Sequence, residues 1–289
     1  MNEPGPRLSP PLVVSDPGGG SVHPAAMIAS LVRNRQLLAR LTERELAGRF
    51  RGSWLGPIWL GLQPLFMLAV YTFALGYVLK ARWGEAPSDS PLTYALFLYT
   101  GLLTFSVFAE TISRAPTVLL ENTSYIKKMR FPIEILPVVP LAAALVNFAF
   151  GFVILLVLRM IIEGPPPLTA LLVPLPLLPL VLLTLGLSWF LAALGVFLRD
   201  LRQLIGVLVS ALLFLSPIFY PLSILPEWIR PFMALNPLAP IVGTMRDLVF
   251  FGRLPDWQTF GLSVAFCALI AWLGFIWFKK TRRGFADVL

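Results

Sequence analysis

The sequence predicts an all-α integral membrane protein with six transmembrane helices, an amphipathic helix before them, and re-entrant helices between spans five and six. Three observations predict this fold class. Of the 289 residues, 57% are hydrophobic and only 13% are charged, whereas soluble domains carry about 25% charged residues. The apolar residues gather in six segments near or above the ~20 residues that cross a bilayer. The basic residues gather mainly in alternate connections between these segments.

Residues 1–26 form a leader rich in Pro, Gly and Ser, with the stretches "PGPRLSPP" and "DPGGGSVHP". This composition predicts a disordered cytoplasmic leader. The leader lacks the basic start and the following apolar run of about 7–15 residues that a signal peptide needs. It holds the one histidine of the chain, His23, and a single histidine makes no metal site.

Residues 27–52 predict an amphipathic interface helix. At about 100° per residue, four arginines fall within a sector of roughly 40°: Arg33, Arg40, Arg44 and Arg51. Apolar residues occupy the far side: Ile28, Leu31, Leu38 and Leu46. Such a helix is expected along a membrane surface, with its arginines reaching phosphates or a partner. A solvated helix with a packed apolar face is the alternative.

Six apolar segments within residues 53–283 are the predicted spans. They cover residues 55–79, 92–112, 133–162, 168–198, 204–221 and 259–278. The fourth has three prolines in its first half. Prolines inside a span are tolerated where protein or a wet cavity surrounds the carbonyls that they leave unpaired. Residues 284–289 are the predicted cytoplasmic tail.

Residues 222–256 fit no simple span. Two moderately apolar stretches are broken by four prolines, which predicts two short helices that enter the outer interface and return. A seventh full span is the alternative. Arg230, Arg246 and Asp247 argue against it, because charged side chains are unfavourable within the hydrocarbon.

The basic residues predict that both termini are cytoplasmic. With six spans and the N-terminus inside, 17 of the 23 Lys and Arg residues face the cytoplasm and five face outside, while Arg159 lies near the outer end of span three. This bias also explains the net charge of +8 without a nucleic-acid partner. The expected location is the cytoplasmic (inner) membrane.

Motifs of several enzyme classes are missing from the sequence. It has no G-x-x-x-x-G-K-[ST] phosphate loop, no H-E-x-x-H, no C-x-x-C and no G-x-S-x-G. Its single cysteine, Cys267, cannot form an internal disulfide. The spans hold few ionisable groups, among them Glu110, Glu134 and Arg159, and offer no proton relay near mid-membrane. If the protein transports a substrate, we expect the energy to come from another chain.

The stretch "RAPTVLLENTSYIKKMRFP", residues 114–132, is the longest loop on the predicted inner side. Residues 117–129 predict a short helix, because Pro116 suits its first turn and Pro132 ends it. The loop has a basic end and apolar side chains to bury: Leu119, Leu120, Tyr125 and Ile126. A cytosolic protein could hold such a helix in a cleft. A basic loop with no partner is the alternative.

Aromatic residues are the other signal. Trp54, Trp228 and Trp257 lie where interfacial belt residues are expected. Six aromatics are candidates to line a path, because flat rings let the apolar faces of sugars slide past: Trp59, Phe66, Tyr71, Phe214, Phe219 and Tyr220. Ordinary packing is the alternative for each of them.

Four stretches together resemble the permeases of polysaccharide-exporting ABC transporters. They are "RFRGSWLGPIWLGLQPL" at 49–65, "NTSYIKKMRFPIEILP" at 122–137, "FLRDLRQL" at 197–204, and the segment from "LLFLSPIFYPL" to "MRDLVFFG" at 212–252. They occur in the order in which that family has them, and the resemblance covers residues 30–283. The leader lies outside it.

The resemblance implies a homodimer of six-span subunits that encloses an aromatic-lined channel. Two copies of a cytoplasmic ATPase subunit would bind ATP and Mg, so this chain needs no cofactor, and it would itself be no enzyme. The implied substrate is a lipid-linked O-antigen, capsular polysaccharide or teichoic acid, with O-antigen favoured. Membrane lipids are the other expected contact.

The resemblance also implies roles for particular residues. The interface helix and a coupling helix at about 116–130 would transmit the motion of the ATPase through Glu121, Asn122, Tyr125, Ile126, Lys127, Lys128 and Arg130. The interface helix is expected to contact a lipid phosphate or the membrane interface through Arg44, Arg49, Arg51 and Ser53. The alternative for Arg49 and Arg51 is that they only anchor the helix on the inner side. Gly52 and Gly56 would let the chain turn into the first span. The segment 222–256 would gate the outer end through Trp228, Arg230, Asn236, Arg246 and Asp247.

Three other functions were weighed. A membrane glycosyltransferase or lipid phosphatase would need carboxylates, His or Arg clustered at one interface, and Arg246 with Asp247 is too little. A passive channel needs no ATPase. An ABC permease that exports drugs or other lipids shares the six-span plan and is the main alternative. The Arg-Gly-Ser-Trp-Leu-Gly and Ile-Lys-Lys-Met-Arg-Phe-Pro stretches favour the polysaccharide branch.

Overall fold

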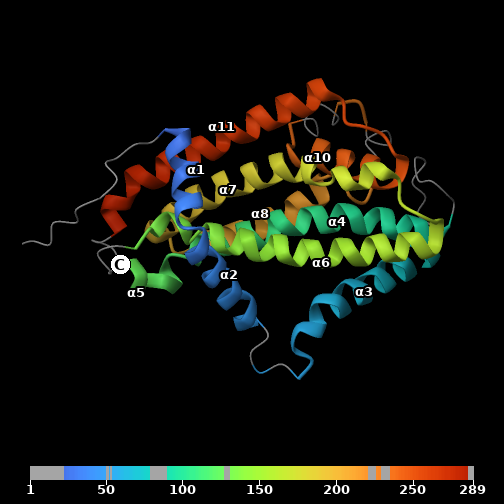
Figure 1. Cartoon of the computed structure of the whole chain (residues 1–289), viewed down its shortest axis with the longest axis horizontal. Helices are drawn as coiled ribbons and strands as arrows, with labels where there is room; N and C mark the ends of the chain where they lie inside the picture. Colours follow the sequence, from blue (N-terminus) through green and yellow to red (C-terminus); the bar gives the residue numbers. More distant parts are fainter. Residues whose placement is uncertain are drawn as a thin grey trace, which may run out of the picture.

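A computed structural model describes residues 23–49, 52, 54–78, 90–126, 131–220, 226–228 and 235–285, and these parts of the chain are helical, with no β-strand among them. Four long helices run along the long axis: α4 (Pro91–Arg114), α6 (Val138–Glu163), α7 (Pro174–Phe197) and α11 (Trp257–Thr281). Helix α7 packs along α11, and α4 packs along α6 (Figure 1). Proline begins α4 and α7, where its missing N–H would be unpaired in any case.

Four helical segments are long and apolar enough to cross a membrane: Pro91–Thr117, Ile133–Glu163, Leu168–Phe197 and Trp257–Gly284. They coincide with predicted spans two, three, four and six. The other two apolar helices are shorter, at Gly61–Ala74 and Leu201–Leu215. An integral membrane protein is therefore supported, with four spans of full length among the described residues.

The two short apolar helices have different ends from the predicted spans. Helix α3 (Trp59–Tyr71) continues as a π-helix over Thr72–Val78. Helix α8 (Leu201–Leu215) begins before residue 204 and ends well before the predicted residue 221. Ser216 is extended, with φ −98° and ψ 145°, because Pro217 disfavours helical backbone in the residue before it.

The predicted interface helix is divided in two. Helix α1 (Pro24–Arg33) ends at Asn34, where φ is −103° and ψ is 16°, and α2 (Arg35–Arg49) follows at once. The Asn34 side chain donates to the carbonyl of Ser30 at 2.8 Å, which closes the end of α1. Helix α1 contacts α11 and α2 contacts α6, so the pair crosses the end of the bundle (Figure 1).

Helix α4 is the most buried of the four long helices, and α7 and α11 form an extensive seam beside it. Trp189 is fully buried and meets the ring of Phe275 edge-on, at 5.1 Å between centroids. Gly186 and Gly274 bring the two backbones into contact, because a Cβ on Gly274 would lie 2.0 Å from the carbonyl oxygen of Gly186. Small residues permit such close approach between membrane helices.

The bundle has two distinct ends (Figure 1). One holds α1, α2, the loop turns at 115–126 that end in α5 (Thr123–Ile126), and the C-terminal end of α11. We call it the basic end. The other holds the turn after Glu163, the 3-10 helix Leu168–Leu172 and α10 (Leu238–Arg246) with the π-helix Asp247–Phe251. We call it the loop end.

Candidate functional site

A cavity of about 930 Å³ lies between α3, α4, α6 and α8. Aromatic and aliphatic side chains form most of its wall: Trp59, Pro64, Met67, Tyr71, Tyr99, Leu102, Leu103, Phe105, Val209 and Leu213. Polar side chains interrupt that wall: Gln63, Ser106, Ser113, Asn147 and Ser210. Charged side chains lie toward its basic end: Arg49, Glu110 and Arg114. The cavity therefore has an amphipathic wall that leads to a charged mouth.

Three helices meet at one oxygen in this mouth. Arg49, the last residue of α2, donates from Nη1 to Glu110 Oε2 on α4 at 2.8 Å. Asn147, on α6, donates from Nδ2 to the same oxygen at 3.1 Å. The arginine and glutamate side chains are 26% and 34% exposed, so the ion pair is open to solvent.

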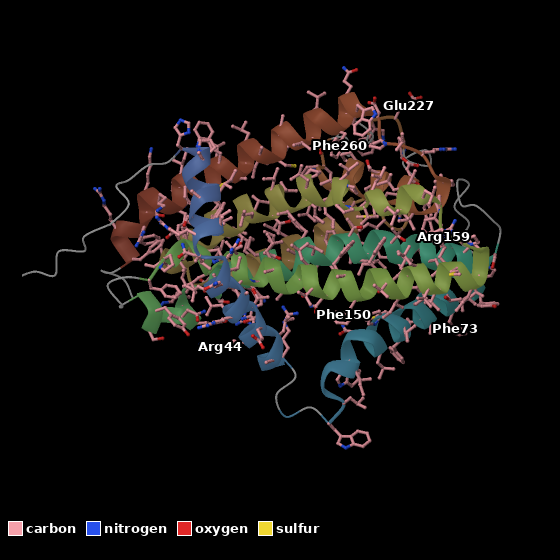
Figure 2. The ribbon with its side chains drawn as sticks, viewed as in Figure 1. Arg44, Phe73, Phe150, Arg159, Glu227 and Phe260 are labelled. Carbon is pink, nitrogen blue, oxygen red and sulfur yellow. The ribbon has the colours of Figure 1, made fainter. Side chains whose placement is uncertain are left out.

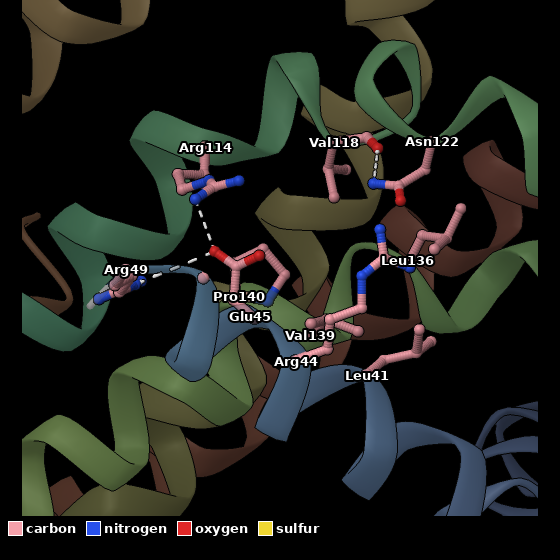
Figure 3. Close-up of a pocket in the computed structure, with 11 residues that line it drawn as sticks. Leu41, Arg44, Glu45, Arg49, Arg114, Val118, Asn122, Leu136, Val139 and Pro140 are labelled. Atoms are coloured by element: carbon pink, nitrogen blue, oxygen red, sulfur yellow. Dashed lines mark hydrogen bonds and ion pairs between the residues drawn. The ribbon is translucent and has the colours of Figure 1, made fainter. Parts of the chain in front are cut away.

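A second group of charges ties α2 to the loop that follows α4. Arg114 donates to Glu45 at 2.5 Å and to Glu121 at 2.9 Å. Thr117 donates to the other oxygen of Glu121 at 2.8 Å. Arg114 and Glu45 border a smaller cavity of about 380 Å³, in which Glu45 lies between Arg114 and Arg49 (Figure 3). The interface helix is thus joined to the end of α4 by paired charges.

The loop has an aromatic contact with α2 as well. Arg44 projects from α2 at the basic end (Figure 2) and donates to the hydroxyl of Tyr125. Its guanidinium carbon lies 5.8 Å from the centre of that ring. The Tyr125 ring stacks on Phe131, with 4.8 Å between centroids. Helices α5 and α2 are therefore in direct contact through the side chains of Tyr125 and Arg44.

Glu134 is a buried charge at the basic end, 5% exposed. Its carboxylate lies 3.5 Å from Lys279 Nζ and 3.6 Å from Arg282 Nη1, and it accepts from the Ser30 hydroxyl at 3.0 Å. The Trp189 indole donates to the backbone carbonyl of Glu134 at 2.9 Å. This one residue thus connects α1, α7 and the end of α11. A buried carboxylate needs such partners, because an unpaired charge is strongly unfavourable in the interior.

Arg246 is the corresponding buried charge at the loop end, also 5% exposed. Its guanidinium donates to the carbonyls of Pro217 and Ile218 at 2.8 Å each and to that of Phe97 at 3.2 Å. It lies 4.3 Å from the centre of the Phe97 ring. A Cβ at Gly101 would come within 2.8 Å of Arg246 Nη2, so glycine leaves room for it. Arg246 thereby joins α10, α4 and the segment after α8.

Two polar residues complete the loop end. Asn236 donates to the Ser216 hydroxyl at 2.9 Å and accepts from the backbone N–H of Leu238 at 2.9 Å, which links the end of α8 to the start of α10. Asp256 caps α11, accepting from the hydroxyl and the backbone N–H of Thr259. These bonds hold the pKa of the exposed Asp256 carboxyl below its ordinary value.

Comparison with known proteins identifies the family of this chain. Residues 36–250 match the family model of the ABC-2 type transporter. The chain belongs to the ABC-2 type transporter family. The resemblance seen in the four sequence stretches is therefore confirmed at the level of the family.

Individual ABC-2 relatives are similar over most of their length. The chain is 30% identical to the O-antigen export system permease protein RfbA of Myxococcus xanthus, over 90% of this chain and 98% of that protein. It is 26% identical to the protein of the same name from Klebsiella pneumoniae, over 88% and 95%. It is 22% identical to the polysialic acid transport protein KpsM of Escherichia coli, over 83% and 91%. These names are those of transport proteins.

Only some of the six aromatic residues that were predicted to line a channel border the cavity. Trp59 and Tyr71 line it. Phe66 is 68% exposed on α3, and Phe214 stacks on Phe219 at 5.6 Å near the end of α8. Tyr220 donates to the carbonyl of Phe214 there. These four are not among the residues that border this cavity in the described part of the chain.

The predicted coupling and phosphate residues are partly described. Arg44, Arg49, Glu121 and Tyr125 join the charged and aromatic contacts of the basic end. Asn122 donates to the carbonyl of Val118 at 2.8 Å. The loop has short turns at Ala115–Thr117, Leu120–Asn122 and Thr123–Ile126, where one helix was expected. Ile126 ends α5. Five residues of these two sets lie outside the described residues: Arg51, Ser53, Lys127, Lys128 and Arg130.

Only some of the five residues that were predicted to form the outer gate lie close together. Asn236 and Arg246 both contact the end of α8, and Asp247 begins the π-helix after α10. Trp228 is 71% exposed, and Arg230 lies outside the described residues. Sequence reasoning assigned no role to Glu110, Glu134, Asn147 or Tyr99. The signal that marks the first three is a polar side chain within an otherwise apolar segment.

Proposed function

We propose that the chain is the transmembrane subunit of an ATP-driven exporter that moves a lipid-linked polysaccharide, with O-antigen favoured, across the cytoplasmic membrane. The observation that carries the proposal is the amphipathic cavity. Trp59, Tyr71 and Tyr99 offer flat rings, and Asn147 and the serines offer hydrogen-bonding groups. Such a wall suits a chain of sugars, which has apolar C–H faces and hydroxyl rims. The names of the relatives, two O-antigen export permeases and a polysialic acid transport protein, support the same substrate class.

The proposed topology has six spans, with α3 and α8 as the two short ones. The basic end faces the cytoplasm, since basic residues concentrate on that side of bacterial membrane proteins. Both termini are then cytoplasmic. The segment 222–256, with α10 and the π-helix, forms the re-entrant gate on the outer side. The contacts of Arg246 and Asn236 with the end of α8 support a gate that is joined to the cavity wall.

The proposed channel forms between two copies of the chain. Large apolar side chains are exposed on the two short helices: Leu62, Leu65, Phe66, Val70, Leu204, Val207, Leu208 and Phe214. In a membrane such side chains face lipid or another chain, because both surround them with apolar groups. A second copy placed against α3 and α8 encloses the cavity and brings Phe66 and Phe214 into the channel region.

Two copies of a cytoplasmic ATPase subunit bind ATP and Mg in this proposal, because the chain has no phosphate loop of its own. They contact the coupling segment at about 116–130. Motion passes to α2 through two routes, the pair of Tyr125 with Arg44 and the group of Glu121, Arg114 and Glu45.

Co-purification with the ATPase subunit tests the energy source. We expect a complex of two plus two chains that hydrolyses ATP in mild detergent. A chain that purifies without an ATPase under all conditions contradicts the proposal. Deletion of the gene tests the substrate. Loss of surface glycan is the expected result, whereas intact glycan with altered drug sensitivity favours an exporter of drugs or other lipids.

A further inference from the structure

We infer that Glu110 is an exchangeable internal counter-anion of Arg49, and that a phosphate or diphosphate group at the cavity mouth displaces it. The inference rests on the proposed function, because it names the group by which a lipid-linked substrate is recognised. It makes Glu110 and Asn147 specificity-determining residues, in addition to the arginine.

The geometry of the mouth is the first argument. Arg49 and Asn147 approach from α2 and α6 and donate to one and the same oxygen, Glu110 Oε2, at 2.8 and 3.1 Å. The two donors thus define a position for a single anionic oxygen. A phosphate oxygen fits the same position, since a guanidinium binds carboxylate and phosphate with the same planar set of donors.

The charge balance is the second argument. Among the described residues, two guanidiniums, those of Arg49 and Arg114, and one carboxylate, that of Glu110, line the cavity. Glu45, which pairs with both arginines, borders the smaller cavity behind them. Glu121 pairs with Arg114 on that same side, in the loop after α4. Arg114 therefore stays paired when Glu110 moves away, whereas Arg49 keeps only the approach of its Nε to Glu45 at 3.9 Å. The Arg49 guanidinium then turns its Nη1 donor to the cavity without an anion, which suits a phosphate group.

The exposure of the ion pair is the third argument. The Arg49 and Glu110 side chains are 26% and 34% exposed. An ion pair open to water contributes little stability, so its exchange is easy. A diphosphate carries more charge and more acceptor oxygens than a carboxylate, and a guanidinium binds both with two parallel hydrogen bonds.

Exchange at this position has a consequence for coupling. Arg49 is the last residue of α2, and its bond to Glu110 holds that end of α2 to α4. The same helix is joined to the loop by Arg44 and Glu45. Displacement of Glu110 therefore changes the attachment of the helix that contacts the coupling loop. Substrate bound in the mouth thereby alters the contacts between α2 and the coupling loop.

The test measures binding of a fluorescent isoprenyl diphosphate to the full chain in lipid nanodiscs, by anisotropy. Glu110→Gln keeps an acceptor oxygen but removes the charge, so it is expected to bind the probe about tenfold more tightly. Arg49→Gln is expected to bind it about tenfold more weakly. The matched control is Glu163→Gln, which also removes a carboxylate paired with an arginine, Arg159, but lies at the loop end and outside the cavity. It is expected to bind as the wild type does.

Competitors distinguish the source of the phosphate. Displacement of the probe by inorganic pyrophosphate assigns recognition to the phosphate group alone. Displacement by unlabelled isoprenyl diphosphate only assigns it to a lipid headgroup. Either result supports the inference. Displacement by the uncharged isoprenol as effectively as by the diphosphate overturns it, because the apolar chain would then carry the binding.

Asn147→Asp provides an independent variant if Glu110→Gln does not yield monodisperse protein. It adds a carboxylate beside the same oxygen, so binding is expected to weaken about tenfold. Unchanged binding in both Glu110→Gln and Asn147→Asp refutes the exchange. The assay needs neither ATPase nor glycan. A chain that binds as expected but exports no polysaccharide therefore refutes the proposed function and leaves this inference standing.

Discussion

The glycine contact between α7 and α11 makes a strong prediction for Gly274→Ala. A Cβ at this position would lie 2.0 Å from the carbonyl oxygen of Gly186, and real Cβ atoms are not found within 3.0 Å of such atoms. The obstacle is backbone, so no side chain can rotate away. The two helices must separate by about 1 Å, and they lie in the best-packed seam of the bundle.

The size of the effect follows from this separation. A gap of ~0.5–1 Å forfeits about a quarter to a half of the dispersion energy at the contact. Overpacking a well-packed interior costs about 1–3 kcal/mol, and a rigid backbone obstacle places Gly274→Ala at about 3 kcal/mol. That is a large part of a typical stability of ~5–15 kcal/mol. Thermal unfolding in detergent, followed by circular dichroism, measures the loss.

The same helix offers a matched control. Gly261 also lies in α11, but a Cβ there would meet nothing within 4 Å. Gly261→Ala is expected to raise stability by about 0.5–1 kcal/mol, since alanine favours helix more than glycine does. If Gly274→Ala unfolds within ~0.5 kcal/mol of the wild type, a difference typical of an unconstrained surface site, then α7 and α11 do not meet as closely as described.

Three further predictions concern the buried charges and the coupling loop. Glu134→Ala is expected to lower the free energy of unfolding by about 1–3 kcal/mol, because it removes the buried carboxylate that two partly buried cations, Lys279 and Arg282, share; thermal unfolding measures this. Arg246→Met is expected to lower the free energy of unfolding by about 1 kcal/mol for each of the three carbonyls that lose their donor. A protease is then expected to cleave the loop end faster. Tyr125→Ala removes a ring stack worth about 0.5–1.5 kcal/mol and the bond to α2; in the complex with the ATPase, we expect ATP hydrolysis to persist while glycan export falls.

Controls separate these effects from general damage. Arg253→Met removes a cation from an exposed position over the Phe251 ring and is expected to change stability by less than about 0.5 kcal/mol. Tyr125→Phe keeps the stack on Phe131 and should retain more export than the alanine variant. Equal loss of hydrolysis and export in Tyr125→Ala would mean that the loop only holds the ATPase. For Glu134→Ala, an unchanged unfolding temperature contradicts the buried role.

Much of the fold could be predicted from the sequence, because the local composition of a segment largely determines whether it forms a membrane helix. Long apolar runs and the charges that flank them identified the four full-length spans and the two shorter helices. Proline marked where helices begin and end, as at Pro91 and Pro174. The break of the interface helix at Asn34 was missed, because a single side chain that closes a helix end leaves little trace in a hydrophobic pattern.

Sequence by itself therefore determined that this chain is a helical membrane protein, and its four motif stretches identified the family. Only the tertiary structure decided which polar atoms meet. Glu110 pairs with Arg49 across 61 positions, Glu134 with Lys279 across 145, and Arg246 with the carbonyl of Phe97 across 149. Hydropathy reports whether a segment leaves water, which depends on its own residues. Pairing depends on how the helices pack and rotate against one another, which is a property of the whole bundle.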